Sequence, residues 1–165
     1  MPVFEKSMNT NELRNEIERL FPFVPKPEGS SLPFHKDECF ECEHVRMYLA
    51  EYEGSELPPK AIRWIYQEMS CLSADGWRWV LPSYLRYCLT QEASSSDIET
   101  EFLIYNLGPS ERFKDETLNR LSMFNSDQIK CLIGFLLWCK NQEHWAIYCP
   151  EDIDRAIDFL GQIRI

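Results

Sequence analysis

The feature that most constrains the fold is an apolar segment at residues 73–89, which reads SADGWRWVLPSYLRYCL. Its apolar residues recur at three- and four-residue spacing, and this period predicts a helix buried on one broad face. We expect at least one of its tryptophans, Trp77 and Trp79, to point into the core. Pro82 lacks the N–H that a helix interior requires. The segment should therefore form a kinked helix or two short helices, around which the other elements pack.

The composition is that of a folded protein and not of a disordered one. Of the 165 residues, 44% are hydrophobic and 13% are aromatic, which is enough apolar material for a substantial core. Helical spacing recurs along the chain, and no alternating strand pattern extends over more than a few residues. We therefore expect an all-α fold, in which residues 1–165 form a single compact domain of about seven helices with the kinked aromatic helix at its centre.

Capping residues and prolines predict where the helices begin and end. The second helix should run from about Asp37 to the neighbourhood of Tyr52, and a surface run at residues 91–96 should end the aromatic helix. A proline-rich connection is expected at residues 22–36, and an irregular loop with one short helix at residues 109–125. The predicted helix starts are Asn9 (paired with Glu12), Asp37, Pro58, Ser73, Ser96 (paired with Glu99), Asn125 (paired with Gln128) and Pro150.

The charge of the chain restricts its partners. Twenty-seven acidic and seventeen basic side chains give a net charge of −10, which opposes nucleic-acid backbones and anionic membranes and suits a basic protein. The acidic residues are densest at Asp37, Glu38, Glu41 and Glu43. We predict that these four residues form a surface that binds a basic protein partner, with no role in binding nucleic acid or membrane.

Cysteine usage and hydropathy predict the compartment. The seven cysteines are odd in number, and four lie within apolar helical patterns, where a free cysteine behaves as a small hydrophobic residue. No apolar run comes near the roughly 18 residues that a membrane span needs, and no signal peptide is visible. These features predict a cytoplasmic protein with reduced thiols. The four cysteines are Cys71, Cys88, Cys131 and Cys139.

His35, Cys39 and Cys42 are the best candidates for a functional site. Thiolate and imidazole groups suit zinc, and Cys-x2-Cys spacing lets two sulfurs reach one ion. The alternative is that Cys39 and Cys42 only pack inward at the start of an amphipathic helix with an acidic first turn. A tetrahedral zinc site needs a fourth ligand, and spacing does not choose among Glu38, Glu43, His44, His144 and Cys149.

Other catalytic patterns are absent from the sequence. It contains no glycine-rich phosphate loop, no G-x-S-x-G nucleophile motif and no H-E-x-x-H pair. His144 lies beside Trp145 and near Tyr148, surroundings more typical of a packed histidine than of a catalytic one. No reaction is identified, so a non-catalytic role is favoured.

The order of these motifs resembles that of a bacterial family of uncharacterised proteins. Its members share a helix that runs into Phe-Pro, here Phe21 and Pro22, a Cys-x2-Cys helix start and an aromatic segment of the LPxYL type. The resemblance extends from about Leu13 to Leu160, although this chain reads WVLPSYL where an aromatic pair often precedes Leu-Pro. It implies a shared fold and a bacterial, cytosolic context. It transfers no catalytic residue, because the family has no established activity.

Two functions remain open. The first is an interaction module, such as an immunity or antitoxin protein that binds and masks a toxin partner. The second is a small metal-binding protein or enzyme with a zinc site at His35, Cys39 and Cys42. The acidic composition and the missing catalytic pattern favour the first.

Overall fold

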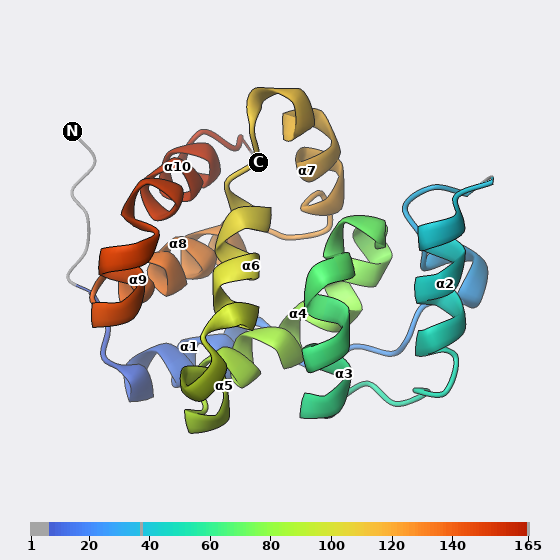
Figure 1. The fold of residues 1–165 in the computed structure, drawn as a ribbon, viewed down its shortest axis with the longest axis horizontal. Coiled ribbons are helices and arrows are strands. Elements are labelled where there is room, and N and C mark those ends of the chain that lie inside the picture. Colours follow the sequence, from blue (N-terminus) through green and yellow to red (C-terminus); the bar gives the residue numbers. More distant parts are fainter. Residues whose placement is uncertain (1–6, 37, 165) are drawn as a thin grey trace.

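A computed structural model describes residues 7–36 and 38–164 of the chain (Figure 1). These residues form ten α-helices and three short 3-10 helices, and their β-type pairing is limited to one antiparallel bridge between Pro33 and Leu72. The all-α class is confirmed, whereas the expected number of about seven helices is wrong. The α-helices are α1 (Thr10–Leu20), α2 (Phe40–Leu49), α3 (Pro59–Ile65), α4 (Ala74–Cys88), α5 (Gln91–Ser96), α6 (Ile98–Leu107), α7 (Lys114–Arg120), α8 (Ser126–Lys140), α9 (Glu143–Tyr148) and α10 (Pro150–Gly161). The 3-10 helices are η1 (Gly29–Ser31), η2 (Tyr66–Cys71) and η3 (Glu111–Phe113).

The aromatic segment forms α4, a continuous helix with Pro82 inside it. Both tryptophans are buried, Trp77 at 1% and Trp79 at 0% exposure, and Ser73 caps the helix by accepting a hydrogen bond from the Gly76 N–H. The expected division into two short helices is therefore wrong. An internal proline costs a helix about 3 kcal/mol. The burial of most α4 side chains outweighs that cost.

The first and the last described α-helices both pack against α8. Helix α1 packs against α8, and α8 in turn packs against α10. The side chain of Gln128 donates a hydrogen bond to the Leu20 carbonyl (2.9 Å), and the Trp138 indole donates to the Thr10 hydroxyl (3.1 Å). Figure 1 shows α9 and α10 at one end of the molecule and α2 at the other. No helix in the described part of the chain is long and apolar enough to cross a bilayer.

Two of the three predicted capping pairs occur in the structure. Asn9 accepts from the Glu12 N–H at 2.9 Å, and Asn125 and Gln128 form a reciprocal capping box. The pair at Ser96 and Glu99 is not a cap, since their side chains bond to each other and the cap position belongs to the next residue, Asp97.

The region around Ser96 and Asp97 also differs from the expected surface run. Residues 91–96 form the short helix α5, which Thr90 caps by accepting from the Ala93 N–H. Asp97 adopts a left-handed conformation (φ 60°), which only a few residue types tolerate well, and it separates α5 from α6. The sequence shows no signal for this because serine-rich runs favour turns as readily as helix.

The stretch at 109–125 is more regular than expected, because it contains η3 and α7. Helix α7 is tied to the core by Arg120, which is 6% exposed and donates a hydrogen bond to the Ser70 carbonyl at 2.7 Å. This contact spans 50 residues, so local sequence patterns cannot reveal it. Helix α9 was likewise not predicted.

Residues 22–36, between α1 and α2, contain no regular element apart from η1 and the bridge at Pro33, and two sets of hydrogen bonds fasten them. The ammonium group of Lys26 donates hydrogen bonds to the carbonyls of Leu49 (2.7 Å) and Tyr52 (2.6 Å). Further along, the Phe34 N–H donates to the Cys71 carbonyl at 2.8 Å, next to the Pro33–Leu72 bridge. These bonds hold the approach to α2 beside the end of η2.

Candidate metal centre

Three predicted ligands converge where the extended segment enters α2. His35 precedes the helix, Cys39 is its N-cap and Cys42 lies in its first turn. One ligand atom from each residue lies within 4.8 Å of the other two. His35 Nδ1 and Cys42 Sγ are 3.5 Å apart. The structure thus brings together a group that can hold a metal ion.

The local backbone explains this convergence. The expected helix start near Asp37 is wrong: α2 begins at Phe40, Asp37 lies outside the described residues, and Glu38 has a left-handed φ of 53°. The chain therefore turns before the helix. Cys39 caps it, since its Sγ accepts a hydrogen bond from the Cys42 N–H at 3.4 Å. His35 lies next to the cysteines although it is outside the helix.

The three candidate ligands differ in how deeply they are buried. Cys42 is only 1% exposed and belongs to the core, Cys39 is half-buried, and His35 is exposed. The centre therefore lies at the boundary between core and solvent, within reach of an ion from outside. Cys42 is followed on the buried face of α2 by Val45 and Leu49, so part of the packing interpretation also holds.

The Cys39 thiol is not an activated nucleophile. The neighbouring Cys42 side chain is the main cause of a raised pKa of Cys39, and it outweighs the Cys42 backbone N–H, which lowers that pKa. The nearby carboxylate of Glu41 (3.7 Å from Sγ) also raises it. A reactive cysteine needs a lowered pKa, because the thiolate is the attacking species. A metal ion, in contrast, replaces the thiol proton directly.

The other proposed fourth ligands lie elsewhere. The Glu43 carboxylate pairs with Arg46, which lowers the pKa of Glu43. The His44 ring lies 5.7 Å from the Trp64 ring, and His144 Nδ1 lies 3.4 Å from the Asp97 carboxylate. Cys149 precedes α10, a helix that packs against α6, α8 and α9. Glu38 is not part of the group that converges.

Two residues that the sequence did not single out border the group. Cys71, 9% exposed, ends η2, and its carbonyl accepts the hydrogen bond from Phe34 already described. The Arg120 guanidinium lies over the Phe34 ring at 4.2 Å. Cys71 was interpreted as a core cysteine, and its distance from Cys42 in sequence gives no metal-binding spacing.

The predicted acidic surface is present in part. Glu38 and Glu41 are exposed, Glu43 is exposed but paired with Arg46, and Asp37 is not described. Partner binding by these residues stays a prediction.

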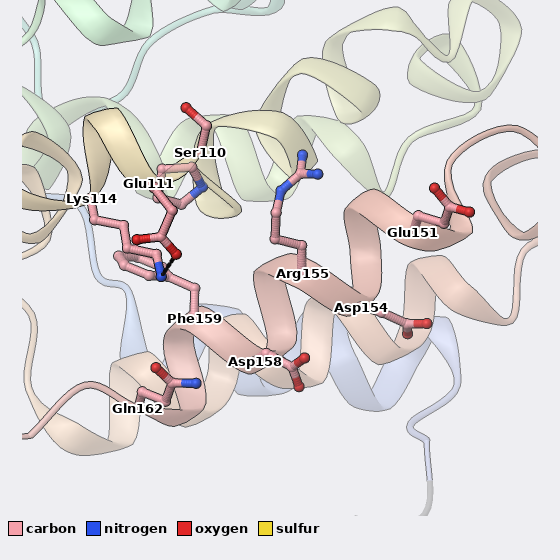
Figure 2. A pocket seen from close by; sticks show the side chains of 10 residues that line it. Ser110, Glu111, Lys114, Glu151, Asp154, Arg155, Asp158, Phe159 and Gln162 are labelled. Carbon is pink, nitrogen blue, oxygen red and sulfur yellow. Dashed lines mark hydrogen bonds and ion pairs between the residues drawn. The ribbon is translucent and has the colours of Figure 1, made fainter.

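A wide groove lies between η3, α7 and α10, and Figure 2 shows its charged lining. Its cations are already bound: Lys114 pairs with Glu111 at 2.6 Å, and Arg155 donates to the Gly108 carbonyl (2.8 Å) and to Asp152 (2.6 Å). The lining also includes three acidic side chains of α10, Glu151, Asp154 and Asp158. The groove therefore offers no converging set of unpaired groups, and the cysteine–histidine group is the stronger candidate.

Comparison with known proteins gives one match. A family model described as "Family of unknown function (DUF6714)" matches residues 9–147, a range that includes the whole candidate centre. Neither the curated proteins nor the solved structures contain a significant match.

Proposed function

The chain belongs to DUF6714, a family of unknown function, and we propose that it is a zinc-binding helical domain in which the ion fixes the start of α2. The observation that carries this proposal is the convergence of His35, Cys39 and Cys42 within 4.8 Å. Three different backbone positions supply these ligands, namely an extended segment, a helix cap and a first helical turn.

The chemistry of the group favours zinc. Thiolate and imidazole ligands suit this ion, which binds sulfur at about 2.3 Å and nitrogen at about 2.0 Å. In a regular tetrahedron these bond lengths place a nitrogen and a sulfur about 3.5 Å apart. The separation between His35 Nδ1 and Cys42 Sγ is 3.5 Å, so this edge already has the length that zinc requires. The carboxylate of Glu41 adds negative charge that attracts a cation.

A structural role is favoured over a catalytic one. His35 and Cys42 are an imidazole–thiol pair, but the Cys42 thiol is buried in the core and not open to a substrate, and the more exposed Cys39 has a raised pKa. An ion bound here would join the extended segment at His35 to α2 and would thereby stabilise an approach that otherwise depends on a few backbone hydrogen bonds.

The metal content of purified protein tests this proposal. Protein produced with zinc in the medium should contain about one zinc per chain by elemental mass spectrometry. The double variant Cys39→Ser/Cys42→Ser should lose it, whereas Cys131→Ser, which changes a buried cysteine on α8, should keep it. Removing the ion with a chelator should lower the melting temperature of the parent and not that of the double variant. Protein that neither contains zinc nor takes it up in a titration would refute the proposal.

A second function is favoured by the outer face of α2, and we propose that this face binds a basic protein, as an immunity or antitoxin protein binds its toxin. Phe40 is 84% exposed and Met47 is 63% exposed, and helical spacing places both on the same face as His44. Large exposed apolar side chains beside acidic ones are typical of interaction sites. The charges would guide a basic partner, and the apolar residues would contribute the contact area.

Binding kinetics with a partner captured from the source organism test this second function. The double reversal Glu38→Lys/Glu41→Lys should slow association, and added salt between about 0.05 and 0.5 M should slow it too, because steering by exposed charges is screened. Phe40→Ala should speed dissociation, whereas Met123→Ala, which changes an exposed apolar residue outside α2, should not. An association rate that ignores both the reversal and the salt would exclude the acidic surface.

A further inference from the structure

A third cysteine, Cys71, borders the candidate centre. The Cys71 carbonyl accepts a hydrogen bond from the Phe34 N–H at 2.8 Å, directly before His35 in sequence. Its element, η2, packs against α2, the helix that carries Cys42. Backbone contacts that do not depend on an ion therefore hold Cys71 near His35 and near the helix that carries Cys42.

The Cys71 thiol neighbours that of Cys42, although it lies outside the group whose ligand atoms are all within 4.8 Å of one another. Burial raises the pKa of Cys71 to about 12, and the next largest causes are the charge and the hydrogen bond of the neighbouring Cys42. Its sulfur also lies 3.8 Å from the carboxylate of Glu68. That separation is long, so the contact with Glu68 holds the thiol only weakly.

We infer that Cys71 is the fourth ligand of the zinc ion and that the buried guanidinium of Arg120 balances the charge of the resulting site. This inference rests on the proposed zinc function and adds the two residues that complete it. The coordination set becomes three thiolates and one imidazole, a combination common in structural zinc sites. Two of its members, Cys42 and Cys71, are buried, which closes the inner side of the centre.

The charge of such a site requires a cation nearby. Three thiolates, one neutral histidine and a zinc ion carry a net charge of −1, and a charge at a buried position is costly unless it is compensated. Arg120 is 6% exposed and lies over Phe34, and it donates to the carbonyl of Ser70, the residue before Cys71. It is the buried cation next to this group.

Arg120 is itself incompletely satisfied by its present partners. Its Nε has no hydrogen-bond partner among the described residues, and its nearest carboxylate, on Glu116, is 3.5 Å away and 42% exposed. A buried N–H without an acceptor is destabilising. A cluster of thiolates beside Arg120 would supply the negative charge that the distant, partly exposed carboxylate of Glu116 supplies only in part.

Sulfur counting on the metal-loaded protein tests the inference without any mutation. X-ray absorption on the zinc protein should show three sulfur ligands and one nitrogen, at about 2.3 Å and 2.0 Å. Two sulfurs would refute the role of Cys71 while leaving the zinc function intact. Protein that binds no zinc would refute the zinc function itself, so the two failures are distinguishable.

Variants test whether Cys71 supplies the third sulfur ligand and whether Arg120 balances the charge of the site. With cobalt(II) in place of zinc, Cys71→Ser should lose about one third of the thiolate-to-metal absorption and bind at least about tenfold more weakly, since even outer-shell changes cost that much. Cys131→Ser should change neither quantity. Arg120→Met should weaken binding by about 10- to 100-fold, and Arg120→Lys, which keeps the charge, should recover part of the loss. Unchanged affinity and absorption in Cys71→Ser, with the loss appearing in Glu41→Gln, would assign the fourth position to Glu41 and overturn the inference.

Discussion

The indole Nε1 of Trp79 donates a hydrogen bond to the backbone carbonyl of Gly54, 3.0 Å away. This bond ties the middle of α4 to the connection between α2 and α3. The ammonium group of Lys26 lies 5.2 Å from the centre of the same indole ring. Three separate parts of the chain therefore depend on one side chain, which is fully buried.

Replacement of Trp79 should be among the most destabilising changes in the protein. Trp79→Ala should lower the free energy of unfolding by about 3–5 kcal/mol, the usual cost of removing a large buried aromatic. Trp79→Phe should cost less, because it keeps most of the packing and loses the bond to Gly54. Urea denaturation measures both. Tyr148→Ala, which changes a side chain that is 69% exposed, is the control and should stay within about 0.5 kcal/mol of the parent. A Trp79→Ala variant that melts within a degree or two of the parent would contradict the central place of α4.

The contact between α6 and α10 predicts opposite effects at two glycines. A Cβ atom at Gly108 would lie 2.9 Å from the Ala156 backbone nitrogen and 3.1 Å from its Cβ, so the helices would have to separate. Gly108→Ala should destabilise by about 1–3 kcal/mol, the range found for overpacking. Gly161 has no atom within 4 Å of such a Cβ, and Gly161→Ala should be neutral or slightly stabilising. Equal melting temperatures for the two variants would show that the close approach at Gly108 is absent.

Buried thiols predict a loss of stability at alkaline pH. Burial raises the pKa of Cys88 and of Cys131 to about 12, from an ordinary value of 9.0. Between these values the unfolded chain has released protons that the folded protein keeps, so the free energy of unfolding falls as pH rises. Each thiol should contribute a slope of up to about 1.4 kcal/mol per pH unit.

Denaturation curves between pH 8 and 11, in reductant, check this slope. The double variant Cys88→Ala/Cys131→Ala should lose stability less steeply above pH 9 than the parent, although its stability at pH 7 is lower. If the free energy of unfolding fell with pH at the same slope in the two proteins, these thiols would have the same pKa in the folded and in the unfolded chain.

All seven cysteines are free thiols in the structure. Protein purified anaerobically and denatured with a chelator but no reductant should therefore give seven equivalents with a thiol reagent. The chelator releases any thiolate held by an ion, so the result does not depend on metal content. A shortfall of two equivalents would reveal a disulfide.

Local signals predicted the parts of this fold that are determined locally. The caps at Asn9 and Asn125 depend on side chains three residues apart, and the burial of α4 follows from its spacing of apolar residues. Helix α7 is different, because it is anchored by the bond from Arg120 to Ser70 and its own sequence has no continuous apolar face. The residues of the candidate centre also fall into a locally determined set and one that depends on long-range contacts. His35, Cys39 and Cys42 lie close in sequence and were found, whereas Cys71 is brought near by the pairing of residues 32–34 with residues 71–73.

The packing of α1 against α8 has a consequence for synthesis of the protein. Thr10 finds its hydrogen-bond partner, Trp138, 128 residues later. At about 5–20 residues per second, a ribosome needs roughly 6–25 s to make that length of chain. During this interval α1, with Leu13 and Ile17 on its apolar side, lacks α8 and can contact only α4 among these two packing partners. The first helix to be made is thus among the last whose packing is completed.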